Sequence, residues 1–450
     1  MDFIAIVRGI IGIGLLVGIA YLLSNNKKNV NWRLVGSGLI LQFIFAIFII
    51  KGDKLGSFFS PLGWPKQFFN YISKGFVAVL DFTTAGAQFI FGNLALPPGS
   101  ENSIGFFFAF QILPTIIFFA SIMAVLYHLG VMQKIVQAMA WIMAKVMGTS
   151  GAESLSCSAN IFVGQTEAPL MIKPFIKGMT KSELLTIMTG GMATIAGGVM
   201  ASYIQMLGQS FSEAMNIPFD QARIEFASHL LGASIMAAPA ALIISKIIFP
   251  EVETPETAGT VKIKVEKTAA NVVEAAAAGA GEGLQLALNV GAMLLAFIAL
   301  IAMFNAGLES IGDLIGLNTV LMDAYGQPLN MQLILGLVLQ FLAYGIGVPW
   351  DSALDFGSLI GVKVVLNEFV AYTEMSNYIK EGILTDPKAI LMATYALCGF
   401  ANLSSIAIQI GGISPLAPGR RSDLASLGFK AVIGGTLATM MTATLAGVLF

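Results

Sequence analysis

Two short polar stretches in an otherwise apolar chain each carry a glutamate. The first, VGQTEAPL, places Gln165, Thr166 and Glu167 in succession. The second, VLNEFV, places Asn367 beside Glu368. A carboxylate at bilayer depth is costly, so a glutamate inside a membrane segment indicates a functional site. These two stretches are therefore the first candidates for a binding site.

The composition is that of a membrane protein without enzymatic cofactors. Of the 450 residues, 56% are hydrophobic and 11% are charged, against about 25% charged in an average soluble domain. A net charge of −2 argues against a basic surface for nucleic acid. Two cysteines and two histidines cannot build a disulfide framework or a zinc cluster. His128 and His229 lie far apart and no H-x-x-x-H or C-x-x-C spacing occurs, so a metal enzyme is unsupported. The motif G-x-x-x-x-G-K-[ST] is absent, so direct use of ATP is also unsupported.

The apolar runs predict an all-α protein with about eight transmembrane helices. Each run is long enough, or nearly so, to cross about 30 Å of hydrocarbon, and together they cover 3–24, 34–50, 105–128, 183–207, 226–249, 281–308, 389–413 and 424–449. Shorter or broken stretches are interpreted as interfacial or re-entrant elements, at 67–93, 131–147, 155–176, 331–348 and 357–377.

Basic residues in short loops predict the orientation of the chain in the membrane. Lys27, Lys28 and Arg33 follow the first span, so that loop is expected inside and both termini outside. The lysines between residues 51 and 74 do not fit this orientation and have no explanation at this stage. The polar stretch 250–267 is interpreted as a plain cytoplasmic linker between two halves of the chain.

The two halves show the same order of elements. Each has a span, a short apolar segment, a broken polar segment and two further spans, so three crossings per half require the second copy to be inverted. Inverted repeats with interrupted helices are typical of secondary transporters. Four divisions are predicted. Residues 1–100 form an N-terminal scaffold and 101–249 the first repeat; residues 250–280 form a cytoplasmic linker with a helical lead-in and 281–450 the second repeat.

Each broken segment is too short and too polar to span the membrane twice. We expect 155–176 and 357–377 to form re-entrant helical hairpins whose tips carry the polar residues. The spans that follow contain TGGMATIAGGVMASY (189–203) and CGFANLSSIAIQIGG (398–412). Glycine weakens a helix, and an unwound segment frees carbonyl oxygens that bind a cation. Taken singly, any one glycine here is better explained by close helix packing.

Four stretches closely resemble the concentrative nucleoside transporters, in the bacterial, sodium-coupled form. They are NIFVGQTEAPL (160–170), GGMATIAGGV (190–199), VLNEFVAY (365–372) and CGFANLSSIAIQIGG (398–412). The resemblance implies a symporter that imports a uridine-like nucleoside with sodium through an elevator motion. It also implies a homotrimer in the bacterial inner membrane.

The resemblance also implies roles for individual residues. The nucleobase would be read by Gln165, Thr166, Glu167 and Val199. The ribose would be held by Glu368, Phe400, Asn402 and Ser405, with Asn367 beside them. The coupling sodium would be bound by the side chains of Asn160 and Thr194 and by the carbonyls of Val163 and Ile195. These oxygens suit a hard cation, and amides, hydroxyls and carboxylates suit a neutral nucleoside.

Three alternatives remain open from the sequence alone. A proton could drive the same carrier, with Glu167 or Glu368 as its binding group. A channel could be lined by the two hairpins, although a repeat around a polar pocket favours alternating access. An intramembrane enzyme could use the two glutamates as acid and base, but no nucleophile or metal set accompanies them.

Overall fold

The computed structural model describes residues 3–98, 100–259 and 269–450, and every regular element within these ranges is a helix. Within these ranges eight helical segments are long and apolar enough to cross a membrane. This total equals the predicted number, but Ser60–Ala95 is among the eight and the predicted span 389–413 is not. Residues 260–268, within the predicted linker and lead-in of 250–280, lie outside the described residues, as do residues 1–2 and 99. The multi-span all-α architecture is confirmed.

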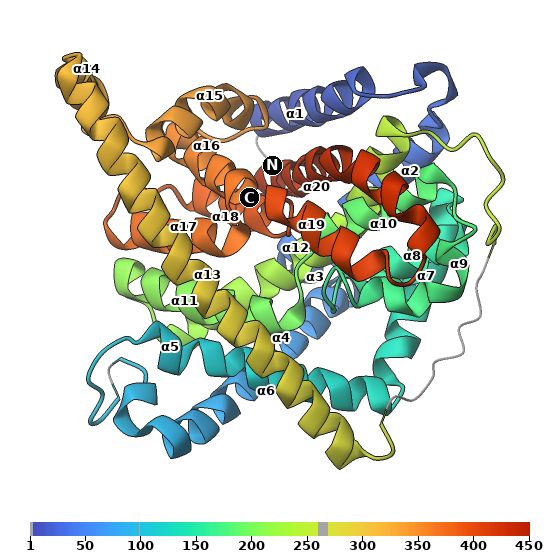
Figure 1. The fold of residues 1–450 in the computed structure, drawn as a ribbon, viewed down its shortest axis with the longest axis horizontal. Helices are drawn as coiled ribbons and strands as arrows, with labels where there is room; N and C mark the ends of the chain where they lie inside the picture. Colours follow the sequence, from blue (N-terminus) through green and yellow to red (C-terminus); the bar gives the residue numbers. More distant parts are fainter. Residues whose placement is uncertain (1–2, 99, 260–268) are drawn as a thin grey trace.

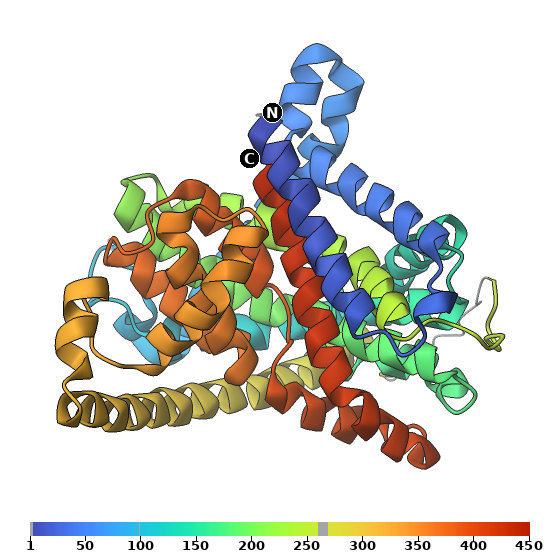
Figure 2. The same ribbon diagram turned by 90° about the horizontal axis from the view of Figure 1, so that it is seen from above.

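The described part of the N-terminal region contributes three helical segments long enough to span a membrane, and all three pack against the bundle. Its helices are α1 (Phe3–Leu22), η1 (Lys27–Asn29), α2 (Trp32–Ile50), α3 (Gly52–Phe58), α4 (Ser60–Phe91), η2 (Gly92–Ala95) and α5 (Phe108–Gln111). Figure 2 shows that α3 and the start of α4 project from the bundle. The segment expected to be interfacial or re-entrant at 67–93 is part of a continuous 32-residue helix, long and apolar enough to cross a membrane.

The first half follows the predicted order, from a span to a hairpin to a broken span. Its helices are α6 (Leu113–His128), α7 (Val131–Met147), α8 (Gly151–Ala159), η3 (Ala168–Ile172), α9 (Lys173–Ile176), α10 (Lys181–Ala193), α11 (Gly197–Met215) and α12 (Phe219–Ile248). The hairpin expected at 155–176 is built by α8, an eight-residue tip, η3 and α9; we call it hairpin 1.

The second half repeats this order. Its helices are α13 (Val272–Leu314), α14 (Leu317–Tyr325), α15 (Met331–Gly345), α16 (Trp350–Val365), α17 (Glu368–Lys380), α18 (Pro387–Leu397), α19 (Leu403–Ile413), η4 (Pro418–Arg420) and α20 (Arg421–Leu449). Helices α16 and α17 form hairpin 2, which is longer than the predicted 357–377. Helix α16 also meets α15 at a bend of 120°.

The span predicted at 389–413 is two helices of eleven residues each. Residues 398–402 separate α18 from α19 and have no regular helical hydrogen bonding. This break falls within the glycine- and asparagine-containing stretch whose sequence predicted unwinding. The first half has the matching break between α10 and α11, at residues 194–196.

The core lies between the halves, where α10, α12, α18 and α20 pack against one another. The apolar window of the α10–α11 segment is 94% buried, and so is that of α12. By contrast, the corresponding apolar window of α13 is 22% buried, and α13 crosses one face of the bundle against α6 (Figures 1 and 2). An apolar helix that is mostly exposed in one chain is typical of a surface that faces lipid or another chain.

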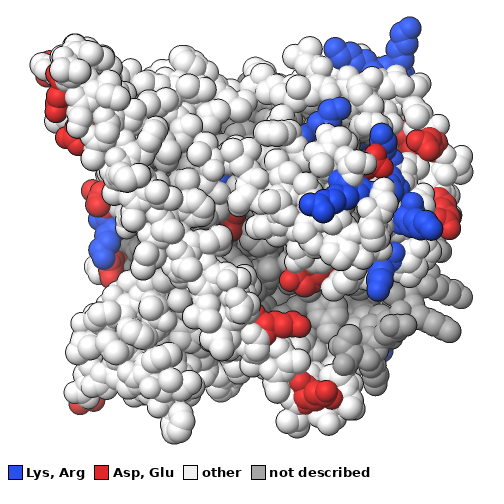
Figure 3. All heavy atoms as spheres, viewed as in Figure 1, with Lys and Arg blue, Asp and Glu red and all other residues white. Residues whose placement is uncertain are grey.

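The charged side chains are unevenly distributed on the face seen in Figure 3. Most Lys and Arg side chains on this face gather toward the right-hand end, together with several acidic ones, whereas the end near α14 shows acidic side chains and few basic ones (Figures 1 and 3). A basic end is the expected cytoplasmic signature of a multi-span protein.

Candidate binding site

The first helix of hairpin 1 is α8, which begins at a strong helix start signal and ends where the polar tip begins. Ser150 and Glu153 form a reciprocal capping box on α8, which satisfies backbone donors at the helix start. After α8 the chain turns through residues 160–167. Within this turn the carboxylate of Glu167 lies directly over the backbone of Gly164. The tip thereby presents amide, hydroxyl and carboxylate groups within a few residues.

Hairpin 2 turns more tightly, through residues 366 and 367. Asn367 caps α17, with its Oδ1 accepting a hydrogen bond from the backbone N–H of Val370 over 2.9 Å. Glu368 is therefore the first residue of α17, where the partial positive charge of the helix start stabilises a carboxylate. Its side chain is 6% exposed.

The breaks in the two interrupted spans lie against each other. The peptide N–H of Phe400 donates to the carbonyl oxygen of Thr194 over 3.3 Å. At Gly399, an added Cβ atom would lie 2.7 Å from the carbonyl oxygen of Met192, so this close approach requires glycine. After the break, Asn402 starts α19 by accepting a hydrogen bond from the backbone N–H of Ser405.

Hydrogen bonds connect four of the residues predicted to bind substrate. Gln165 donates from Nε2 to the Oγ atom of Ser405 over 3.1 Å, although the two residues lie 240 positions apart. Asn402, which caps the helix carrying Ser405, donates from Nδ2 to Oε2 of Glu368 over 3.2 Å. The tips of both hairpins and the start of α19 thus converge on one polar cluster, made of Gln165, Glu368, Asn402 and Ser405.

The other predicted substrate residues lie at the margins of this cluster. Val199 is buried on α11, and Phe400 is half-buried at the break. Thr166 packs so closely on Gly412 of α19 that no Cβ atom would fit there. Glu167 is exposed, and its carboxylate lies over Gly164 of its own turn. The structure therefore separates the two glutamates, because only Glu368 is buried in the polar cluster.

The predicted sodium ligands include an amide that the described protein leaves unpaired. Asn160 is fully buried, and neither polar atom of its side chain has a hydrogen-bond partner within the described residues. An unpaired buried amide costs about 1–3 kcal/mol, so such a group needs a ligand or water. Thr194 is also buried, and its hydroxyl donates to the carbonyl of Gly190 over 2.9 Å, which leaves its lone pairs free. This donor set fits a hard cation.

Tyr203 and Lys363 were not singled out by the sequence analysis, and Gln409 entered it only as a polar residue of the broken span 398–412. Tyr203 on α11 is fully buried and donates its hydroxyl to Oε1 of Glu368 over 3.1 Å. Gln409 on α19 contacts Gln165. Lys363 is fully buried and donates to the carbonyl of Ala396 over 2.8 Å. The sequence could have indicated Lys363 as a candidate functional residue, because it stands in the apolar stretch LIGVKVV and cations inside a membrane segment are rare.

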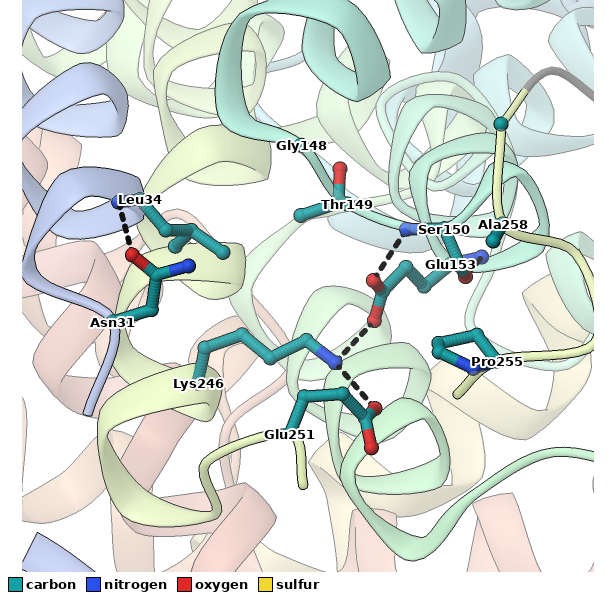
Figure 4. Close-up of a pocket in the computed structure, with 11 residues that line it drawn as sticks. Asn31, Leu34, Gly148, Thr149, Ser150, Glu153, Lys246, Glu251, Pro255 and Ala258 are labelled. Atoms are coloured by element: carbon teal, nitrogen blue, oxygen red, sulfur yellow. Dashed lines mark hydrogen bonds and ion pairs between the residues drawn. The ribbon is translucent and has the colours of Figure 1, made fainter. Parts of the chain in front are cut away.

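A separate polar cavity lies beneath hairpin 1 (Figure 4). It has a volume of about 270 Å³ and is bordered by Asn31, by the start of α8 and by residues that follow α12. Lys246 points between two carboxylates, at 2.8 Å from Glu153 and 3.2 Å from Glu251. None of the predicted substrate or sodium residues lines this cavity, so we treat it as part of the support of hairpin 1.

Two hairpins and two broken spans around a polar cluster define a membrane transporter with a substrate site inside the bundle. Three family models match this chain: Na+ dependent nucleoside transporter N-terminus over residues 11–94, Nucleoside recognition over 109–210, and Na+ dependent nucleoside transporter C-terminus over 229–447. The chain belongs to the concentrative nucleoside transporter family, and it is a nucleoside transporter rather than an enzyme.

Relatives and solved structures agree with this assignment over nearly the whole chain. An uncharacterized transporter of Haemophilus influenzae is 44% identical, covering 98% of this chain and 97% of that protein. The nucleoside permease NupC of Helicobacter pylori is 38% identical, covering 97% and 96%. The structure of CNTnw in an inward-facing substrate-bound state is 39% identical with a TM-score of 0.83, covering 99% of each chain.

Proposed function

We propose that this protein is a symporter that imports nucleosides with sodium. The observation that carries this proposal is the Asn160 amide, which is fully buried and unpaired within the described part of the chain. A sodium ion between Asn160, Thr194 and the carbonyls of Val163 and Ile195 would satisfy it, because sodium prefers oxygen ligands. The mouse relative is a sodium/nucleoside cotransporter, 40% identical over 95% of this chain and 61% of its own length.

The polar cluster is the proposed nucleoside site. Gln165, Thr166 and Glu167 of hairpin 1 would face the nucleobase, with Val199 packing on its ring. Glu368, Asn402 and Ser405 would bind the ribose hydroxyls, with Phe400 lining the pocket. Since Gln165, Glu368, Asn402 and Ser405 bond to one another here, a bound nucleoside would replace some of these bonds rather than enter a dry cavity.

An elevator motion is the proposed mechanism. Solved relatives include CNTnw in inward-facing and outward-facing states, the latter a variant 39% identical with a TM-score of 0.85. These two states support alternating access. In this proposal sodium orders hairpin 1, the nucleoside binds between the hairpins, and this domain moves against a scaffold that includes the N-terminal spans of residues 1–100.

The proposed setting is the bacterial inner membrane, with both termini outside and three chains per assembly. The basic side chains at the hairpin 1 end support placing that end in the cytoplasm. The mostly exposed, apolar α13 supports a contact with other copies of the chain or with lipid. The linker of residues 250–280 would then lie on the cytoplasmic side, between the two repeats of 101–249 and 281–450.

Uridine uptake into proteoliposomes tests the proposal. An inward sodium gradient is compared with a proton gradient alone, each with and without a membrane potential. Uptake that requires sodium supports the Asn160 and Thr194 site. Uptake with protons alone would move coupling to a glutamate, and that alternative is less favoured because the full set of sodium ligands is present. Single-channel currents would instead indicate a pore.

A further inference from the structure

Gln409 is a fully buried amide in the middle of the second broken span. Its Nε2 atom donates to two acceptors, the carbonyl oxygen of Met188 on α10 and Oε1 of Gln165, each over 3.0 Å. It therefore connects three elements that come from different halves of the chain. Its exposed fraction is 0%, and that of Gln165 is 7%, so water does not compete freely for these bonds.

The Met188 carbonyl determines which way both amides face. A peptide carbonyl can only accept a hydrogen bond, so the Gln409 atom beside it must be the NH₂ group. The same NH₂ group faces Gln165, whose nearest atom must then be Oε1. The NH₂ group of Gln165 is thereby directed to the Oγ atom of Ser405, at 3.1 Å. A backbone carbonyl of α10 thus fixes the orientation of the hairpin 1 amide through Gln409.

Close packing keeps this arrangement in place. Gly191 lies beside both amides, and a Cβ atom there would be 2.8 Å from Nε2 of Gln409 and 2.9 Å from Cβ of Gln165. Helix α10 therefore approaches the pair as closely as glycine allows, which leaves little room for either side chain to rotate.

We propose that Gln409 is a positioning residue that sets the hydrogen-bond pattern offered to the nucleobase. This inference rests on the proposed role of Gln165 in base recognition. With Oε1 of Gln165 occupied by Gln409, Gln165 presents its NH₂ group to the ligand and favours a base that accepts a hydrogen bond there. Without Gln409, the Gln165 amide can turn over and present its oxygen, which favours a base that donates.

The test compares uridine with cytidine, whose bases carry opposite donors and acceptors at positions 3 and 4. We expect Gln409→Met, which keeps the side-chain volume and removes the donor, to change the ratio of the two kcat/KM values by about fivefold, the size of one neutral hydrogen bond. Ile408→Met is the matched control, because Ile408 neighbours Gln409 on α19 and is 43% exposed. We expect it to leave the ratio unchanged.

A double variant separates positioning from a general structural role. In a Gln165→Ala background, Gln409→Met should no longer change the uridine to cytidine ratio, because Gln409 acts through Gln165. An unchanged ratio in the single variant, or an equal change in both backgrounds, overturns the proposal. If a variant does not transport, the ratio of the two dissociation constants in detergent is measured instead, and Gln409→Leu serves as a second variant. Absence of nucleoside uptake by the unmodified protein would instead refute the proposed function.

Discussion

The peptide N–H of Phe400 bonds to the carbonyl oxygen of Thr194 over 3.3 Å, and this bond joins the two broken spans at their breaks. Thr194 belongs to the proposed sodium site, and Phe400 belongs to the proposed ribose pocket. A shift of either break is therefore expected to affect the other, through this bond and through the close packing of Gly399 on the carbonyl of Met192. We infer that sodium and nucleoside affinities are coupled here, and such coupling is reciprocal.

Replacing Asn160 by leucine tests the ion site. We expect Asn160→Leu to abolish the sodium dependence of uridine uptake and the stabilisation by sodium in thermal unfolding. We also expect the unfolding free energy in the absence of sodium to be equal or higher, because an unpaired buried amide is replaced by an apolar side chain of similar size. Uptake against sodium concentration and thermal unfolding measure the two effects.

Gln42 provides the matched control for this variant. It is also fully buried on α2 with both side-chain polar atoms unpaired within the described residues, but it is not among the predicted sodium ligands. Gln42→Met should affect stability in the same direction and leave sodium dependence unchanged. A normal sodium response in Asn160→Leu would contradict the proposed ion site.

Gly399 tests the contact between the breaks. In Gly399→Ala the new methyl group would lie 2.7 Å from the Met192 carbonyl oxygen, so the two breaks must move apart. We expect transport to fall by at least about tenfold, the equivalent of 1.4 kcal/mol, with helical content by circular dichroism unchanged. The control is Gly411→Ala on α19, where a Cβ atom meets nothing within 4 Å. Equal activity of both variants would mean that the contact is not needed.

The sequence predicted the hairpins and the broken spans because polar residues and glycines are conspicuous in apolar runs. It also placed Gln165, Asn402, Ser405 and Glu368 in one site through the family resemblance. The start of α8 could have been read more accurately, since Ser150 followed three residues later by a glutamate is a helix start signal.

The contacts that orient these residues could not be predicted from the sequence. Gln409 meets Gln165 across 244 positions, and Tyr203 meets Glu368 across 165, so both depend on how the two halves pack. Gln409 stands out in its apolar span only as one polar residue among several, and a single buried amide is ordinarily explained by helix packing. Only the three-dimensional arrangement distinguishes these side chains from others of their kind.

Glu368 is expected to need its charge. Its two oxygens accept hydrogen bonds from Tyr203 and Asn402. Glu368→Gln would remove the charge and replace one oxygen by an NH₂ group, which would meet another donor at Asn402 or require the Tyr203 hydroxyl to turn and accept. A hydrogen bond to a charged group contributes about 1.5–3 kcal/mol, so kcat/KM for uridine should fall by about 10- to 100-fold. Tyr203→Phe removes one donor and leaves the acceptor intact, and we expect a smaller loss. A larger loss in Tyr203→Phe than in Glu368→Gln would refute this account of the pair.

Lys246 is expected to hold the base of hairpin 1 by neutralising a buried carboxylate. The Glu153 side chain is 1% exposed and has its ion pair with Lys246, whereas Glu251 is 21% exposed. Removing one partner of a buried pair costs about 3–5 kcal/mol because the other charge stays buried. Lys246→Met should therefore lower the stability of the protein markedly in thermal unfolding, and Glu251→Gln should have a smaller effect. Adding Glu153→Gln to Lys246→Met should restore part of the loss, since it removes the uncompensated charge. If the double variant is as unstable as Lys246→Met alone, the lysine acts through packing of its side chain rather than through its charge.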